Sequence, residues 1–132
     1  MKTIVLDSFA ILAYLQNEDG AQKVEELLLA AQAGKIRLLI NRINLGEVFY
    51  LSAKRKGLET ARQILKEFSL LPVEIISPSD DLIDQAAQLK AQYPISYADG
   101  FVAATAFEFQ AEIISGDKDF QYLEKLLKII WL

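Results

Sequence analysis

The sequence predicts an α/β protein with a mainly parallel β-sheet. Its β-branched and apolar runs are short and do not alternate with polar residues, which is typical of strands buried on both faces. Segments with apolar residues at helical spacing separate these runs, and that order is typical of α/β layering. No internal repeat, low-complexity segment or linker interrupts the 132 residues, so we expect one domain over residues 1–132.

The first quarter of the chain predicts one strand and two helices. Residues 3–6 form an apolar, β-branched run, and residues 9–15 are apolar with helical character. Residues 21–33 repeat apolar side chains at helical spacing, and Gly34 follows them. Because glycine is favoured just after a helix C-terminus, we expect the second helix to stop there.

The next segment repeats the pattern of strand followed by helices. Residues 37–40 form a second short strand, and either Asn41 or Asn44 can cap the helix that comes after it. That helix ends in the cationic run 54–56, which the helix dipole favours at a C-terminus. Residues 58–70 form another amphipathic helix.

The remaining elements complete five expected strands. Residues 73–76 form the third strand, and residues 82–93 form a helix preceded by strong start signals. Ser96 can cap the next helix. The fourth strand covers residues 112–115 and, after a short helical turn, the last covers residues 127–131.

The composition restricts the possible chemistry. There is no cysteine and no histidine, so thiolate nucleophiles, iron–sulfur sites, histidine-dependent triads and ordinary zinc sites are excluded. Catalysis must therefore use carboxylates, hydroxyls and amines. The net charge of −4 argues against a non-specific nucleic-acid binder, but it leaves open a nucleic-acid enzyme that works with bound cations.

The hydropathy pattern predicts a soluble chain with partners. No segment reaches the ~20 apolar residues of a membrane span, and Asp7 interrupts the N-terminal apolar run that a signal peptide would need. We therefore expect a cytoplasmic location and no membrane contact. The mean hydropathy of +0.20 is high for a small chain, which predicts an apolar surface covered by a partner or a second copy.

Acidic side chains occupy positions that packing alone explains poorly. Asp7 directly follows the first strand and Asp117 follows the fourth, while Glu47 and Asp99 lie in the early turns of helices. In a parallel α/β sheet, sites gather beyond the carboxyl ends of the strands, near the point where strand order reverses. These four acids are therefore expected to meet at that edge.

Each acid also has an ordinary structural explanation. Asp7 and Asp117 fit as helix caps, and Glu47 fits as a solvated helical acid. Asp99 is harder to explain in this way, because its helix is apolar nearly all round and no lysine or arginine is close in sequence. Asp119 fits equally as a supporting acid near the site or as a solvent-exposed side chain.

Together the acids predict a divalent-metal site made of oxygen ligands. Carboxylates without histidine or cysteine suit Mg²⁺ or Mn²⁺ better than zinc, and a cation offsets the repulsion between clustered acids. Such a pocket most often serves hydrolysis of a phosphodiester. Ser8 and Ser115 place hydroxyls beside the acids, either as ligands for a metal or phosphate oxygen or as ordinary caps.

Four short motifs appear in a characteristic order: Val5-Leu6-Asp7-Ser8, Asn44-Leu45-Gly46-Glu47-Val48, Ser96-Tyr97-Ala98-Asp99-Gly100, and Ser115-Gly116-Asp117-Lys118-Asp119-Phe120. In these motifs the chain resembles the PIN-domain ribonucleases, and among them the VapC-type toxins of bacterial and archaeal toxin–antitoxin pairs. The resemblance covers nearly the whole chain.

The resemblance implies a fold, an activity and a set of site residues. The implied fold is a three-layer α/β/α arrangement around a mainly parallel five-stranded sheet. The implied activity is endoribonucleolytic cleavage of tRNA or other structured RNA, with a cognate antitoxin as inhibitor. Asp7, Glu47, Asp99 and Asp117 match the acidic quartet that binds Mg²⁺ or Mn²⁺ and carries catalysis. Ser8, Ser115 and Asp119 match supporting positions.

The sequence signals for contacts with RNA and with protein partners are less specific than those for the metal site. The run Lys54-Arg55-Lys56 is a candidate RNA contact, although it also reads as a solvated helix end, and Arg42 lies near the predicted site. The apolar excess fits a homodimer with an additional groove for the antitoxin. The competing interpretation is a non-catalytic PIN-like module that binds RNA or protein.

Overall fold

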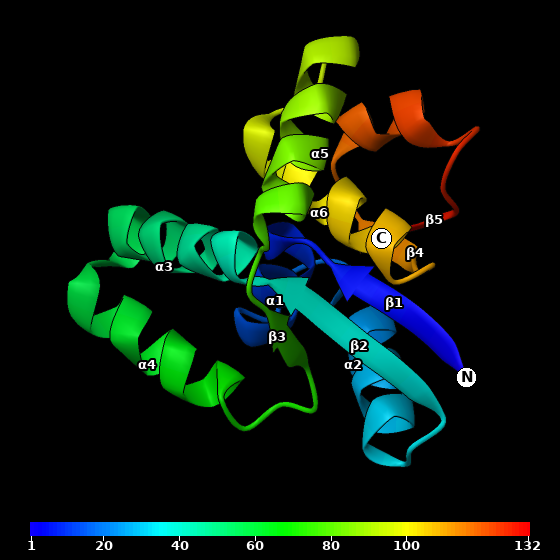
Figure 1. Cartoon of the computed structure of the whole chain (residues 1–132). Helices are drawn as coiled ribbons and strands as arrows, with labels where there is room; N and C mark the ends of the chain where they lie inside the picture. Colours follow the sequence, from blue (N-terminus) through cyan, green and yellow to red (C-terminus); the bar gives the residue numbers. More distant parts are fainter.

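The computed structural model describes residues 1–132 and contains five strands and seven helices (Figure 1). Their bounds, in chain order, are β1 (Lys2–Leu6), α1 (Ser8–Leu15), α2 (Ala21–Gln32), β2 (Ile36–Asn41), α3 (Arg42–Lys56), α4 (Leu58–Phe68), β3 (Glu74–Ile76), α5 (Asp80–Gln92), α6 (Tyr97–Glu108), β4 (Glu112–Ser115), the 3₁₀ helix η1 (Lys118–Leu123) and β5 (Ile129–Trp131). No helix combines the length and apolar composition that crossing a membrane requires.

All five strands are parallel and lie in the order β3-β2-β1-β4-β5. From β1 the chain moves outward through β2 to β3, then crosses over to β4 and β5 on the other side of β1. The strand order therefore reverses between β1 and β4. The edge beyond the carboxyl ends of these two strands is the place where a parallel α/β sheet offers a binding site.

Helices cover both faces of this sheet, which confirms the predicted three-layer arrangement (Figure 1). Along β1, Ile4 and Leu6 face the core formed with α1, α2, α3 and α4, while Val5 faces the core formed with α5, α6 and η1. Strand β4 divides in the same way between Ile113 and Ile114. Because alternate residues point to opposite faces, a strand between two cores is apolar throughout, as the non-alternating runs predicted.

Hydrogen-bonded caps set where several helices begin. The Asn41 side chain accepts a hydrogen bond from the Ile43 amide at 2.9 Å, so Asn41 and not Asn44 caps α3. Ser79 accepts from the Leu82 amide at 3.1 Å, and α5 consequently begins at Asp80, two residues earlier than the apolar periodicity predicted. The two acids in this first turn then interact favourably with the helix dipole.

Helices α5 and α6 approach closely at Gly100, the residue that follows Asp99. A Cβ atom added at Gly100 would lie 2.8 Å from the Ala86 carbonyl oxygen of α5, which is closer than such contacts occur. Gly46, inside α3, has no such neighbour within 4 Å. The glycine at position 100 therefore allows α6 to carry its first turn deep between α5 and the sheet.

The two glycines give a matched test of this packing. Gly100→Ala should lower the free energy of unfolding by about 1–3 kcal/mol, because the overpacking outweighs the better helix propensity of alanine. Gly46→Ala should raise it by up to about 1 kcal/mol, because only the propensity changes. Urea unfolding of both variants measures the difference, and equal effects would contradict the close helix contact.

Candidate metal centre

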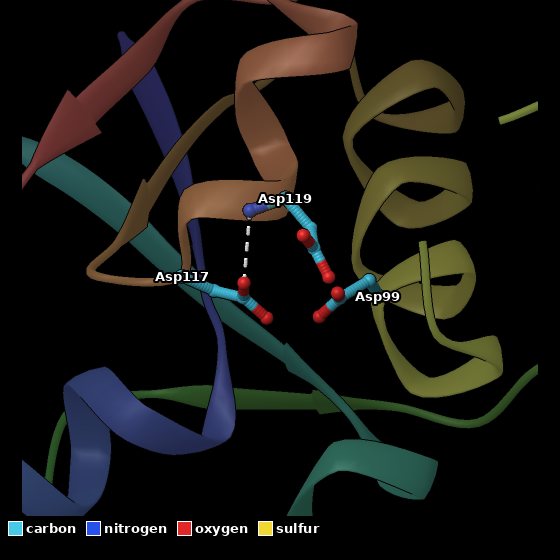
Figure 2. Close-up of side chains that lie close together, drawn as sticks. All are labelled: Asp99, Asp117 and Asp119. Atoms are coloured by element: carbon cyan, nitrogen blue, oxygen red, sulfur yellow. Dashed lines mark hydrogen bonds between the residues drawn. The ribbon is translucent and has the colours of Figure 1, made fainter. Parts of the chain in front are cut away.

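Three carboxylates meet at the carboxyl edge of the sheet. Asp99 lies in the first turn of α6, Asp117 in the turn after β4, and Asp119 in η1; one oxygen from each lies within 4.8 Å of the others. Figure 2 shows the three side chains pointing into one common space. We call these three residues the acidic cluster. Asp99 and Asp117 were predicted to meet here, whereas Asp119 had been left open between a supporting role and solvent.

Hydrogen bonds hold the turn between β4 and η1 in place. The Asp117 carboxylate accepts a hydrogen bond from the Asp119 amide at 2.9 Å and so caps η1 (Figure 2). The Asp117 amide in turn donates to the Ser115 hydroxyl oxygen at 2.8 Å. Two acids of the cluster are therefore positioned by the same short segment that leaves the fourth strand.

Asp7 is buried beside this turn and is held at both carboxylate oxygens. One oxygen accepts from the Ala10 amide at 2.8 Å, which caps α1, and the other accepts from the Ser115 hydroxyl. Since β1 and β4 are neighbours in the sheet, Ser115 links Asp7 to the segment that carries Asp117. The capping role of Asp7 and its place at the site edge are therefore both present.

Asp99 is buried and incompletely satisfied. Its amide donates to the Ser96 hydroxyl at 3.0 Å, which caps α6 as predicted, but its Oδ2 atom is buried without a hydrogen-bond partner. None of the five ion pairs in the structure includes Asp99 or another acid of the cluster. A buried carboxylate oxygen without a partner is costly unless a cation compensates it.

Glu47 lies in the second turn of α3 and is half-buried. It is not part of the acidic cluster, but its charge acts on the buried Asp7 carboxyl. The structure thus brings two members of the predicted quartet, Asp99 and Asp117, within ligand distance of each other, with Asp7 and Glu47 at the border of the same site.

The clustering perturbs the titration of the two most buried acids. Burial raises the pKa of Asp7 to about 7, against the lowering effect of its hydrogen bonds from Ser115 and Ala10, and the nearby charges of Asp117 and Glu47 raise it further. Burial likewise raises the pKa of Asp99 to about 8, together with the neighbouring Asp117 carboxyl and the Asp7 charge. Without a cation, a pKa of about 8 keeps the Asp99 carboxyl mainly neutral near pH 7, and a pKa of about 7 leaves Asp7 between its neutral and ionised forms.

Two further polar side chains lie at the site: Asn44, which was predicted only as an alternative cap of α3, and Ser8, which was predicted either as a ligand or as a cap. The Asn44 amide donates to the Ala98 carbonyl at 3.0 Å and ties α3 to the first turn of α6, while its own carbonyl oxygen is buried without a partner. Its place on the inner stripe of α3, three residues before Glu47, is the sequence signal that marks it. Ser8, which follows Asp7, is also buried and its hydroxyl has no partner.

Of the predicted RNA contacts, one lies at the same sheet edge as the acidic cluster and the others lie further away. Arg42 is exposed at the first position of α3, at the same sheet edge as the acids. Lys54, Arg55 and Lys56 are exposed in the last turn of that helix, away from this edge. Arg55 approaches Glu18, in the turn between α1 and α2, at 3.8 Å.

A comparison with protein families identifies the fold. The model of the PIN domain matches residues 4–126. The chain belongs to the PIN domain family. This finding confirms the family resemblance carried by the four motifs. A comparison with curated proteins gives no match.

Solved structures of toxin–antitoxin proteins share this PIN fold. A chain of VapBC2 from Rickettsia felis, solved with a promoter DNA fragment, has 20% identity and a TM-score of 0.76 over 98% of both chains. A chain of DNA-bound VapBC from Salmonella typhimurium has 18% identity and a TM-score of 0.77 over 99% of this chain and 98% of that one. VapC20 of Mycobacterium tuberculosis, described as a sarcin-ricin loop cleaving toxin, has 20% identity and a TM-score of 0.69 over 90% of this chain and 93% of that one. At these identities the likeness establishes the fold.

The donor set fits a hard divalent cation. The acidic cluster offers only carboxylate oxygens, and Asp99, which belongs to it, has a buried Oδ2 atom without a hydrogen-bond partner. Mg²⁺ and Mn²⁺ prefer such oxygen ligands, and their positive charge would offset the burial and the repulsion that together raise the pKa of Asp7 and Asp99.

Asn44 provides a test of how α3 supports the site. Asn44→Ala should lower the free energy of unfolding by about 1–3 kcal/mol, because the Ala98 carbonyl loses its donor. Gln22→Ala, on the exposed side of α2, should change it by less than about 0.5 kcal/mol. Denaturant unfolding measures both, and equal stabilities would show that the Asn44 bond is not needed.

The raised pKa values predict an unusual pH dependence for the metal-free protein. Folding raises the pKa of Asp7 and Asp99 from 3.8 to about 7 and about 8, so the folded state binds more protons than the unfolded state between these limits. The contribution of Asp7 and Asp99 to the free energy of unfolding is therefore largest below about pH 4. It decreases as the pH rises to about 8, by at most about 1.4 kcal/mol per group and pH unit.

Urea unfolding in chelator from pH 5.5 to pH 8.5 measures this slope, the decrease of the free energy of unfolding with rising pH. Asp99→Asn should flatten it, because asparagine does not titrate, and Mg²⁺ or Mn²⁺ should reverse it, because the metal binds the ionised carboxylates. Stability that rises with pH in chelator would contradict the burial of uncompensated acids.

Proposed function

We propose that this protein is a metal-dependent endoribonuclease that hydrolyses RNA phosphodiester bonds with metal-activated water. The proposal rests mainly on one observation. Three carboxylates from α6, the β4–η1 turn and η1 converge at the switch point of the sheet, and one buried oxygen among them has no partner. Membership of the PIN domain family and the absence of histidine and cysteine support the same chemistry.

In this proposal Asp7, Glu47, Asp99 and Asp117 hold Mg²⁺ or Mn²⁺, and Asp119 joins them. When bound, the metal lowers the pKa of a water molecule, orients it toward the phosphorus and stabilises the leaving oxygen. The chain itself contributes the rigid placement of the acids. Because both oxygens of Asp7 already accept hydrogen bonds, its orientation is set before any ligand arrives.

Positive and hydroxyl groups around the acids would hold the RNA. Arg42 lies at the same edge and is free to contact a phosphate next to the scissile bond. Lys54, Arg55 and Lys56 would contact the RNA backbone further along. The Ser8 hydroxyl, buried without a partner beside Asp7, would donate to a phosphate oxygen.

We further propose that the chain acts as a single-domain, cytoplasmic toxin with a cognate antitoxin and forms a homodimer. Large apolar side chains remain exposed on three helices, among them Leu29 on α2, Tyr50 on α3 and Leu58 on α4. Such surfaces indicate protein partners. The structural neighbours include toxin–antitoxin complexes. A cationic antitoxin side chain entering the acidic cluster would compete with the metal.

Cleavage of total cellular RNA by purified protein tests the activity. We expect discrete fragments with Mg²⁺ or Mn²⁺ and none with chelator. Asp99→Asn should reduce cleavage by roughly 100-fold or more, since loss of a mere supporting partner of a metal ligand already costs roughly 10–100-fold. Glu25→Gln, which removes an exposed acid on α2, should leave cleavage unchanged.

Thermal melting separates loss of chemistry from loss of folding. Asp99→Asn should be at least as stable as the parent in chelator, because it removes an uncompensated buried acid. Mg²⁺ or Mn²⁺ should raise the melting temperature of the parent and have little effect on the variant. No cleavage and no metal-dependent stabilisation would instead support a non-catalytic module.

A further inference from the structure

A pocket of about 520 Å³ adjoins the acidic cluster and is the largest of three in the structure. It lies between α1, the turn that follows α1, and the β4–η1 turn, and we call it the α1 pocket. Asp117 belongs both to its lining and to the acidic cluster. In Figure 2 the start of α1, in blue, lies on the Asp117 side of the three acids. A nucleotide whose phosphate is at the cluster therefore has this pocket within reach of its base.

One wall of the α1 pocket is apolar and aromatic. Phe9 lies two residues after Asp7, lines the pocket and keeps 41% of its surface exposed, although α1 has buried positions nearby. Ala13, one turn further along α1, continues this wall. An exposed aromatic ring next to a phosphodiester site offers a face on which an unpaired base stacks.

Other residues that line the pocket are charged and restrict which ligands can enter it. Glu18 and Asp19 line the pocket, so a phosphate group would be repelled there. A carboxylate instead accepts hydrogen bonds from N–H groups at the edge of a base. Glu18 is paired with Arg55, whereas no ion pair involves Asp19. Asp19 therefore has both oxygens available.

Guanine matches this arrangement better than the other bases. Its Watson–Crick edge presents two adjacent donors, N1–H and the N2 amino group, which fit the two oxygens of one carboxylate. Adenine and cytosine present one amino group beside an acceptor nitrogen, and that acceptor faces repulsion from a carboxylate. Lys118, which also lines the pocket, would supply a positive charge for the adjoining phosphate.

We propose that the α1 pocket binds an unpaired guanine next to the scissile phosphate, with Phe9 stacking on the base and Asp19 accepting from its Watson–Crick edge. The inference rests on the proposed nuclease function and adds a base specificity to it. Arg55 at the basic end of α3 supports it, because its contact with Glu18 at 3.8 Å brings one cationic side chain to a residue that lines the pocket.

Cleavage of a random-sequence single-stranded RNA pool, followed by sequencing of the new ends, tests the specificity. The parent protein should show guanine enriched at one fixed position beside the cut. Asp19→Asn should reduce the ratio of guanine to adenine at that position about tenfold, the usual effect of losing a two-bond contact to a base. Glu25→Gln should retain the enrichment, because Glu25 is exposed on α2 and does not line the pocket.

A binding measurement without turnover tests the pocket separately. Guanosine and inosine, which differ only in the N2 amino group, are titrated into the full chain in chelator while the backbone amide resonances of Gly116 and Lys118 are followed. Guanosine should bind about tenfold more tightly than inosine, and this ratio should fall toward one in Asp19→Asn. Phe9→Leu should weaken both ligands about tenfold, because the stacking face is lost.

The two experiments separate the failure of the pocket from the failure of the nuclease. Metal-dependent cleavage without guanine enrichment, or with an enrichment that survives Asp19→Asn, would overturn the pocket assignment and leave the nuclease intact. Absence of cleavage would contradict the proposed function, while the guanosine titration would still decide whether the pocket selects a base. Equal binding of guanosine and inosine would overturn the inference.

Discussion

The structure depends on the burial of carboxylates at one edge of a parallel sheet without a compensating cationic side chain. Asp7 and Asp99 are taken out of water, and Asp117 and Asp119 are turned toward the same space. Repulsion and burial both oppose this arrangement, so the surrounding fold must hold it in place. The caps of α1, α6 and η1 do so, because each of them also fixes an acid or its backbone.

The fold was largely predictable because its signals are local. Non-alternating apolar runs identified strands lying between two cores, and Ser79 and Ser96 marked helix starts. Boundaries were less predictable, since the cap at Ser79 brings two acidic residues into α5 before its apolar periodicity begins. The strand order, which places β1 beside β4, depends on long-range pairing that no short segment encodes.

The site was predictable where an acid conflicts with its surroundings. Asp99 was recognised because its helix is apolar on all sides, and this residue is indeed buried without a cationic partner. The sequence left Asp119 open between a supporting role and solvent, because the direction of a side chain in a short 3₁₀ helix depends on how the preceding turn is hydrogen-bonded. The α1 pocket was not foreseen, since its walls come from segments about a hundred residues apart and only the assembled sheet brings them together.

The bond between Ser115 and Asp7 joins residues 108 positions apart and has a consequence for biosynthesis. The ribosome completes Asp7 and Glu47 long before it reaches β4, the strand that is followed by Asp117 and Asp119. The acidic cluster cannot assemble on the nascent chain until the segment through Asp119 has emerged. A polypeptide released before β4 by a truncated message would therefore lack Asp117 and Asp119, and with them Ile113 and Phe120 of one of the two cores.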